Sequence, residues 1–356
     1  MLSPNRHLFQ TEQAVLIGAL VGPCKFIMDL IRFAIMLLIF FLENNGSQRG
    51  VFGIGEILKI HGDQCVDYLN LKDKTNVDVI DVQMTSMQYF PEGDCNSTAP
   101  DEELRVLELP NLKILKFLHN KLFKMPNVSG MNNLDEFHMR HTLISTIPGK
   151  PFYNNKLKKI DLARNKLVVA PDLDGAPGTL EILRMTFNRL NYIPNNYFEG
   201  CTKLEEVQLQ GNQLKSFPSF APIGSSLITI HLSGNRLNET IPKDAIAMHP
   251  NLEKLHLKNN QMPAFVISFC NLTKQLDCQA DNNPLVTVEN PYRDCIASIS
   301  TLPKPKLSLT EMQLLSCDEK ICWMKQHGFT TENVNLGICP DGREWKYVTK
   351  EELCPG

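Results

Sequence analysis

The sequence predicts a solenoid, in which one short unit is repeated along the chain. Three observations support this fold class: asparagines recur at nearly constant spacing, each lies in the pattern LxxLxLxxNxL, and the segments between the units are short and rich in proline and glycine. Chains with such internal periods stack their units, and each unit buries its apolar side against its neighbours. The recurring asparagines are Asn120, Asn165, Asn188, Asn212, Asn235, Asn260 and Asn283.

Eight consecutive segments between Leu112 and Leu285 fit the pattern, the last of them loosely as QLDCQADNNPL. From Asn165 onward the asparagines are 23 to 25 residues apart, and Thr142 takes the asparagine position of the second unit. This pattern and period are those of leucine-rich repeats. We therefore predict an α/β fold, a right-handed horseshoe with a parallel concave sheet, a convex side of short helical or irregular pieces, and disulfide-bonded caps.

The LxL part of each unit forms the predicted strand. Side chains two apart on a strand point to the same face, so Leu162, Leu209, Leu232 and Leu257 are expected in the core. The asparagine amide can donate to and accept from backbone groups of the following turn, each of which would cost roughly 1–3 kcal/mol if buried without a partner. Thr142 offers only a hydroxyl, which predicts a weaker turn.

An apolar run near the N-terminus indicates a leader. Lys25 and Arg32 precede FAIMLLIFFL, and the polar stretch ENNGS follows it, which is the order of parts in a signal peptide. The run is shorter than the roughly 20 residues that span a bilayer, so we expect cleavage, with a retained type II anchor as the alternative. A translation start at Met28 would give a leader of ordinary length.

The chain is accordingly divided into four parts. They are a leader at 1–47, a linker and N-terminal cap at 48–111, eight repeats at 112–285, and an insertion with a cysteine-rich C-terminal cap at 286–356.

Charge and sequons limit the partners. The chain has a net charge of -3 and a pI near 6.3, which provides no electrostatic footprint for nucleic acid or for an anionic membrane. We expect neither as a partner once the leader is removed. Sequons at Asn96, Asn127, Asn238 and Asn271 are candidate glycosylation sites and agree with export.

Ten of the eleven cysteines follow the leader and are concentrated toward the two ends of the repeats. Cys65 and Cys95 flank VDVIDVQM, which alternates as a strand does, and a bridge between them would close the N-terminal cap. No CxxC pair and no histidine at ligand spacing occurs, so disulfides are favoured over zinc. The pairing of Cys201, Cys270, Cys278 and Cys295 is left open, and Cys201 or Cys278 could be a buried free thiol.

The C-terminal cysteines, Cys317, Cys322, Cys339 and Cys354, are accompanied by Trp323-Met324 directly after the second of them. This arrangement resembles the C-terminal capping domain of extracellular leucine-rich repeat proteins. The resemblance implies that the first cysteine pairs with the third and the second with the fourth, giving Cys317–Cys339 and Cys322–Cys354. In general form the chain also resembles secreted arthropod repeat proteins related to the non-catalytic subunit of shrimp luciferase.

About thirty residues intervene between Asn283-Pro284-Leu285 and this cap, where the resembling proteins have almost none. The insertion contains Cys295 and the stiff segment TLPKPK. We interpret it as an extra lid over the last repeat.

Outward side chains of the predicted strands form polar columns on the concave face, and such a mixed ladder suits a protein or glycan partner. Phe187 adds an exposed apolar group that could anchor a partner. The candidate partner-binding residues are Lys116, His138, Arg140, Asp161, Arg184, Phe187, Gln208, His231, His256 and Lys258.

His231 and His256 are expected to be in-register neighbours about 4.8 Å apart on adjacent strands. They could be read as a metal pair or as an acid and a base, yet the only carboxylate noted beside them is Glu253. We favour a pH-sensitive contact in which both gain charge near pH 6.5.

The sequence predicts a secreted, non-enzymatic protein without cofactor that holds an extracellular protein or glycan in an adhesion, matrix, immune or accessory-subunit role. It contains no G-x-S-x-G, H-E-x-x-H, P-loop or G-x-G-x-x-G motif. The first alternative is a membrane-anchored receptor or co-receptor, and the second is a metal-dependent enzyme at His231 and His256.

Overall fold

The structure is a computed structural model that describes residues 56–61, 77–83, 111–126, 128–153, 155–173, 178–298, 300–311, 317, 321–339 and 341–354. The predicted leader, the proposed Cys65–Cys95 bridge and the sequons at Asn96 and Asn127 lie outside these residues. The other two candidate glycosylation sites, Asn238 and Asn271, are both exposed.

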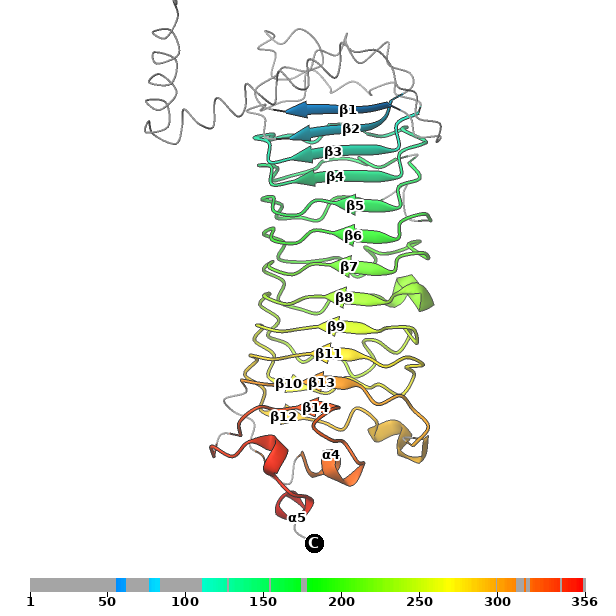
Figure 1. The fold of residues 1–356 in the computed structure, drawn as a ribbon. Coiled ribbons are helices and arrows are strands. Elements are labelled where there is room, and N and C mark those ends of the chain that lie inside the picture. Colours follow the sequence, from blue (N-terminus) through cyan, green and yellow to red (C-terminus); the bar gives the residue numbers. More distant parts are fainter. Residues whose placement is uncertain are drawn as a thin grey trace, which may run out of the picture. The chain divides into compact units, whose positions relative to one another are not determined.

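Twelve strands of the described chain form one sheet, in which every pairing is parallel and the strands follow chain order (Figure 1). They are β1 (Glu56–His61), β2 (Val77–Gln83), β3 (Ile114–Leu118), β4 (Glu136–Arg140), β5 (Lys159–Asp161), β6 (Ile182–Arg184), β7 (Glu206–Gln208), β8 (Thr229–His231), β9 (Lys254–His256), β11 (Asp277–Gln279), β13 (Lys306–Ser308) and β14 (Val334–Asn335). The predicted fold class, a parallel leucine-rich repeat solenoid, is confirmed.

The core lies directly behind the sheet. Equivalent residues pair across successive strands, as in Ile160 with Leu183 and Leu183 with Val207, and these central side chains are fully buried. The second leucine of each LxL pair, exemplified by Leu209 and Leu232, is also fully buried, as the pattern predicts. Each unit therefore buries its apolar side against the units before and after it.

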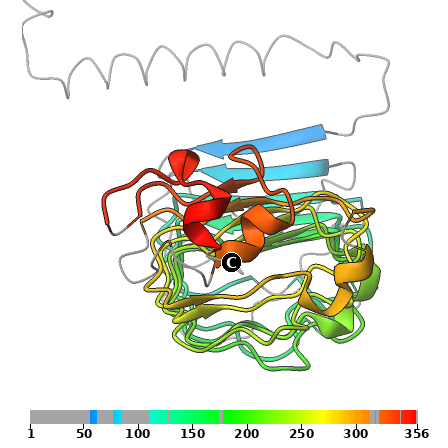
Figure 2. The same cartoon turned by 90° about the horizontal axis from the view of Figure 1, so that it is seen from below.

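The return segments contain little helix and close each turn on the side away from the sheet (Figure 2). Two short strands there, β10 (Ala264–Phe265) and β12 (Thr287–Val288), pair in a second, parallel sheet. Two 3-10 turns are also present, η1 (Ala221–Ser226) and η2 (Arg293–Ser298). Proline and glycine in these segments are incompatible with long helices, which explains the short pieces.

A ladder of buried asparagines joins the repeats behind the strand ends. The Asn212 side chain donates from Nδ2 to the carbonyl oxygens of Met185 and Leu209, both at 2.9 Å, and accepts from the Leu190 amide at 3.1 Å. Asn188, Asn235 and their equivalents repeat this geometry. Thr142 occupies the equivalent place, where its hydroxyl donates to Asn165.

The insertion after the last predicted repeat is not a lid. It continues the solenoid, because its strand β13 pairs with β11 on one side and with β14 on the other. The segment KPKLSLTEMQL keeps the repeat spacing, but Lys304 stands at the first leucine position and Met312 at the asparagine position. These two substitutions explain why the sequence pattern does not reveal this turn.

Three disulfides lie in the C-terminal part of the described chain. Two join Cys317 to Cys339 and Cys322 to Cys354, the same pairs that the resemblance implies. The third joins Cys270 to Cys295 across neighbouring return segments, a pair left open by the sequence. The cap itself consists of α4 (Cys322–Gln326), η4 (Trp345–Tyr347) and α5 (Lys350–Leu353).

Two further cysteines of the described chain, Cys201 and Cys278, are free and fully buried. Burial raises the pKa of the Cys201 thiol to about 11, and it also raises the pKa of Cys278. Both sulfurs therefore pack as small apolar groups.

Candidate functional site

The outward side of the sheet carries three columns of side chains, which together we call the strand face. The first column includes Ile114, Glu136, Lys159, Ile182, Glu206, Thr229, Lys254, Asp277 and Lys306; the second includes Lys116, His138, Asp161, Arg184, Gln208, His231, His256, Gln279 and Ser308; the third includes Leu118, Arg140, Ala163, Thr186, Gln210, Ser233, Lys258, Asp281 and Thr310. The second and third columns follow the predicted register.

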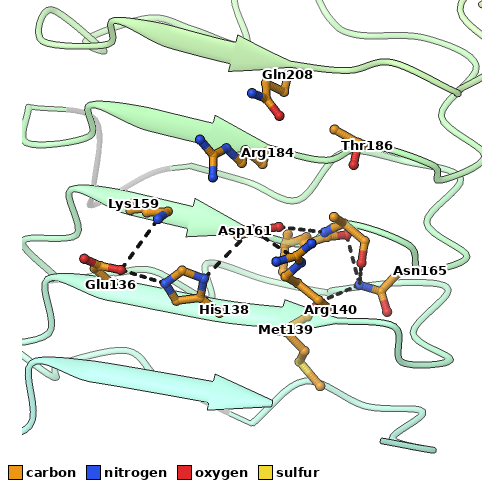
Figure 3. A network of polar contacts seen from close by, with 12 residues as sticks. Glu136, His138, Met139, Arg140, Lys159, Asp161, Asn165, Arg184, Thr186 and Gln208 are labelled. Atoms are coloured by element: carbon orange, nitrogen blue, oxygen red, sulfur yellow. Dashed lines mark hydrogen bonds and ion pairs between the residues drawn. The ribbon is translucent and has the colours of Figure 1, made fainter. Parts of the chain in front are cut away.

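On β4 and β5 the polar groups of the strand face bind one another (Figure 3). His138 Nε2 lies 2.7 Å from a Glu136 carboxylate oxygen, which also lies 3.8 Å from Lys159 Nζ. Asp161 is 2% exposed and lies 3.7 Å from Arg140 Nε and 3.9 Å from His138 Nδ1. These contacts hold five charged or titratable side chains of two strands in one arrangement.

The pKa values in this group follow from burial and pairing. Desolvation lowers the pKa of His138, although its hydrogen bond with Glu136 acts in the opposite direction. The pKa of Glu136 is lowered because its contacts with His138 and Lys159 outweigh desolvation. Near neutral pH His138 is therefore a neutral donor to an ionised Glu136.

A second group spans β6 and β7. Arg184 donates through both Nε and Nη2 to one carboxylate oxygen of Glu206, at 3.0 and 2.7 Å. Gln208 donates to the same oxygen at 2.7 Å. Because Arg184 and Gln208 donate to the same oxygen of Glu206, the guanidinium of Arg184 is held in one position on the surface.

His231 and His256 are neighbours as predicted, with ring centroids 4.9 Å apart in an edge-to-face arrangement. A carboxylate that the sequence interpretation missed, that of Asp277, lies 3.7 Å from His256 Nε2. The expectation that both rings charge near pH 6.5 is wrong. Desolvation and the neighbouring His256 lower the pKa of His231 to about 4, and desolvation also lowers the pKa of His256.

This depressed pKa predicts acid sensitivity of the fold. Below about pH 6.5 the unfolded chain binds a proton at His231 that the folded chain does not, so the free energy of unfolding falls until about pH 4. Allowing for partial exposure of the ring, the His231 share is on the order of 1–2 kcal/mol. His231→Gln should flatten the dependence of the melting temperature on pH in this window, as measured by circular dichroism. Equal slopes for both proteins would contradict the assignment.

Near the C-terminal end of the sheet, Asp281 connects its own turn, after β11, to the neighbouring turns after β9 and β13. One oxygen accepts from the Ser308 hydroxyl at 2.5 Å and from the Thr310 hydroxyl and amide at 2.6 and 2.8 Å, while the other lies 3.1 Å from Lys258 Nζ. These hydrogen bonds outweigh burial and lower the pKa of Asp281. The aspartate thus ties the turn formed by the insertion to the repeats before it.

Nine of the ten predicted residues lie on the strand face. Phe187 is instead on the turn that follows β6, where it is 48% exposed and has a φ of 53°. The sequence interpretation missed the whole first column, and with it Glu136, Glu206 and Asp277. The signal was available, because the same period of two that selects His138 also selects Glu136.

No group of three or more His, Cys, Asp or Glu residues in the described part of the chain is arranged to hold a metal ion. The carboxylates of the strand face are used in the pairs given above.

The repeat consensus and the parallel sheet define the fold as a leucine-rich repeat solenoid. A profile for BspA-type leucine-rich repeat regions matches residues 179–283 in six copies. The chain is similar to human lumican (29% identity over 46% of this chain and 47% of that protein) and to human fibromodulin (34% over 40% of this chain and 37% of that protein). The matched region spans about half or less of these relatives.

Solved structures show the same fold. A chain in the octameric complex of Latrophilin 3, Unc5D and FLRT2 (LRR) has a TM-score of 0.65 at 21% identity, covering 87% of this chain and 95% of that one. A leucine-rich repeat protein of Leptospira interrogans has a TM-score of 0.50 at 18% identity, covering 80% of this chain and 74% of that one. The likeness to proteins related to shrimp luciferase is not shown by these comparisons.

The described residues include no helix of the length and hydropathy needed to cross a membrane. The leader, which the anchored alternative requires, is not among them.

Proposed function

We propose that this is a secreted, non-enzymatic protein that binds another extracellular protein through the strand face. One observation carries the proposal: cross-strand pairs already hold the polar side chains of this face in fixed positions. The Arg184–Glu206 contact and the Lys159–Glu136 contact are examples. A surface whose side chains are ordered before binding loses less conformational entropy when a partner docks.

The similarity to lumican and fibromodulin, found over 46% and 40% of this chain, supports this class of function. A chain of the same fold occurs in the octameric complex of Latrophilin 3, Unc5D and FLRT2. The strand face also offers exposed cations, including Lys254 and the 46% exposed side chain of Arg140, to which acidic partner groups can bind. Adhesion, matrix, immune and accessory-subunit roles all fit such a binding surface.

The test adds bulk at the centre of the strand face without removing an ion pair. Ser233 lies in the third column, and its backbone carbonyl alone is engaged, by the Gly211 amide. Ser233→Trp should reduce partner recovery about tenfold or more in pull-downs from extracellular extracts, because the indole blocks close docking.

Ser225→Trp is the matched control, since it adds the same ring to an exposed residue in η1, on the return side. Both variants should show the melting temperature of the unaltered protein to within a few degrees. Loss of partners from both variants alike, or from neither, would contradict the use of the strand face.

A further inference from the structure

Beyond the strand face, the chain turns at the carboxyl ends of the strands, and this turn edge keeps the register of the repeats. The amides of Lys166, Arg189 and Arg236 donate to carbonyl oxygens of the preceding repeat, those of Ile144, Leu167 and Leu214, at 2.8 to 2.9 Å. Equivalent turn residues therefore lie side by side, one repeat apart, at the strand spacing of roughly 5 Å.

Basic residues gather on this edge and lack acidic partners. Their set, which we call the cationic edge, consists of Lys121, Arg164, Lys166, Arg189 and Arg236, all of them exposed. None of the five forms an ion pair with a described residue, whereas the strand face pairs its carboxylates with bases or hydroxyls. The charge of the cationic edge is thus left to attract an outside ligand.

One member of the cationic edge is held in place by stacking. The guanidinium carbon of Arg164 lies 4.6 Å from the centroid of the Phe187 ring. That ring in turn lies against the backbone of Gly211, where a Cβ atom would approach Phe187 to 2.5 Å. Glycine at this turn, with a φ of 70°, therefore leaves room for the ring that orients the guanidinium.

The positive charge at this edge also affects a neighbouring histidine, His141. The rings of His119 and His141 stack at 4.2 Å on the same row of turns. Desolvation lowers the pKa of His141, and so do the positive charges of His119, Arg164 and Arg140, with no acidic group acting in the opposite direction.

Apolar side chains border the cationic edge. Phe123, Val168, Val169 and Tyr192 follow two or three positions after the basic residues of their turns and are 42% to 66% exposed. A ligand along this edge would thus meet a row of positive charges beside apolar surfaces.

We infer that the cationic edge binds a sulfated polysaccharide, a linear polyanion of the extracellular space. Lys166 and Arg189 lie one repeat apart, and Lys121 and Arg236 lie two repeats beyond them on either side. This row of cations can meet a chain of repeated anions, and each sulfate can accept paired hydrogen bonds from a guanidinium. The apolar border suits the C–H faces of sugar rings. An acidic peptide is a poorer match, because the turn amides of Lys166, Arg189 and Arg236 are already bonded between repeats and do not offer a strand edge for peptide pairing.

The probe is heparin, and the readout is its dissociation constant measured by surface plasmon resonance at physiological ionic strength. Lys166→Glu/Arg189→Glu reverses two neighbouring charges of the cationic edge. Lys203→Glu/Lys274→Glu changes the net charge by the same amount at exposed lysines of the return side. The first variant should bind heparin about tenfold or more weakly than the unaltered protein, and the second should bind within about twofold of it. At physiological ionic strength, salt screens charges far from the bound heparin but only weakly reduces the effect of charges in direct contact with it.

Desulfated heparin should bind far more weakly than heparin to the unaltered protein. Two outcomes would overturn the inference: absence of heparin binding by the unaltered protein, or equal losses in both double variants. Tighter binding of polyglutamate than of heparin, lost in the edge variant, would overturn it in favour of an acidic protein segment. Ser233→Trp should leave heparin binding unchanged, so failure of the strand-face proposal and failure of this inference can be told apart.

Discussion

Replacing Asn212 with alanine is expected to lower the free energy of unfolding by about 2–4 kcal/mol, because it removes three hydrogen bonds and leaves one buried backbone amide without a partner, at roughly 1–3 kcal/mol. The amide left without a partner is that of Leu190. The carbonyl oxygens of Met185 and Leu209 lose one donor each and keep the amides of Asn188 and Asn235, respectively. Asn212 itself is 5% exposed, so water cannot readily replace the lost amide. Urea unfolding followed by circular dichroism measures the loss.

The matched control is Gln213→Ala on the same turn. The Gln213 side chain is only partly buried, and its backbone amide bonds to Leu190 independently of the side chain. Its removal should change the free energy of unfolding by about 0.5 kcal/mol or less. If Asn212→Ala were as mild as Gln213→Ala, the asparagine ladder would not be what joins the repeats.

The fold could be predicted from the sequence because each repeat has the same residue types at its core and turn positions. Leu209 and Leu232 mark core positions, and Asn212 and Asn235 mark the turns behind them. Where a unit lacks these markers, the prediction fails. Lys304 and Met312 replace leucine and asparagine in the turn that contains β13, so only the pair Leu307 and Leu309 remained to indicate a strand.

The candidate site was predicted in outline only. Alternation places Arg184 and His231 on the strand face, but it does not say that Glu206 occupies both Nε and Nη2 of the arginine. Nor does it give the pKa of His231, which depends on desolvation by the packed neighbouring column and on His256. Pair contacts across strands depend on side-chain conformations that periodicity does not encode.

Net charge was the least informative quantity. The net charge of -3 sums the unpaired bases of the cationic edge with acidic residues elsewhere in the chain. The sum therefore does not show the positive potential at this edge. The unpaired bases of the cationic edge cannot be told from the paired lysines and arginines of the strand face in the sequence, because ion pairing depends on the fold.

Breaking the Cys322–Cys354 disulfide is expected to open the C-terminal cap while leaving the central repeats folded. The bridge closes a segment with a sequence separation of 32 residues, and a loop of this size corresponds to about 3–4 kcal/mol in the chain-entropy description. Inside it, Met324, Trp345 and Leu353 are at most 2% exposed and cover the last turns of the core.

The predicted response to Cys322→Ser/Cys354→Ser is local because a solenoid transmits stability mainly between neighbouring units. Amide hydrogen exchange should show faster exchange in α4, α5 and β14, a smaller change in β13, and none in β5 to β8. Cys270→Ser/Cys295→Ser serves as the comparison, since that bridge joins return segments and not the cap. Its loss should expose amides around β12 and η2 and leave α5 protected. Uniform exchange across all strands in the first variant would mean that the repeats unfold as one cooperative unit, and that the cap is needed to keep the whole stack folded.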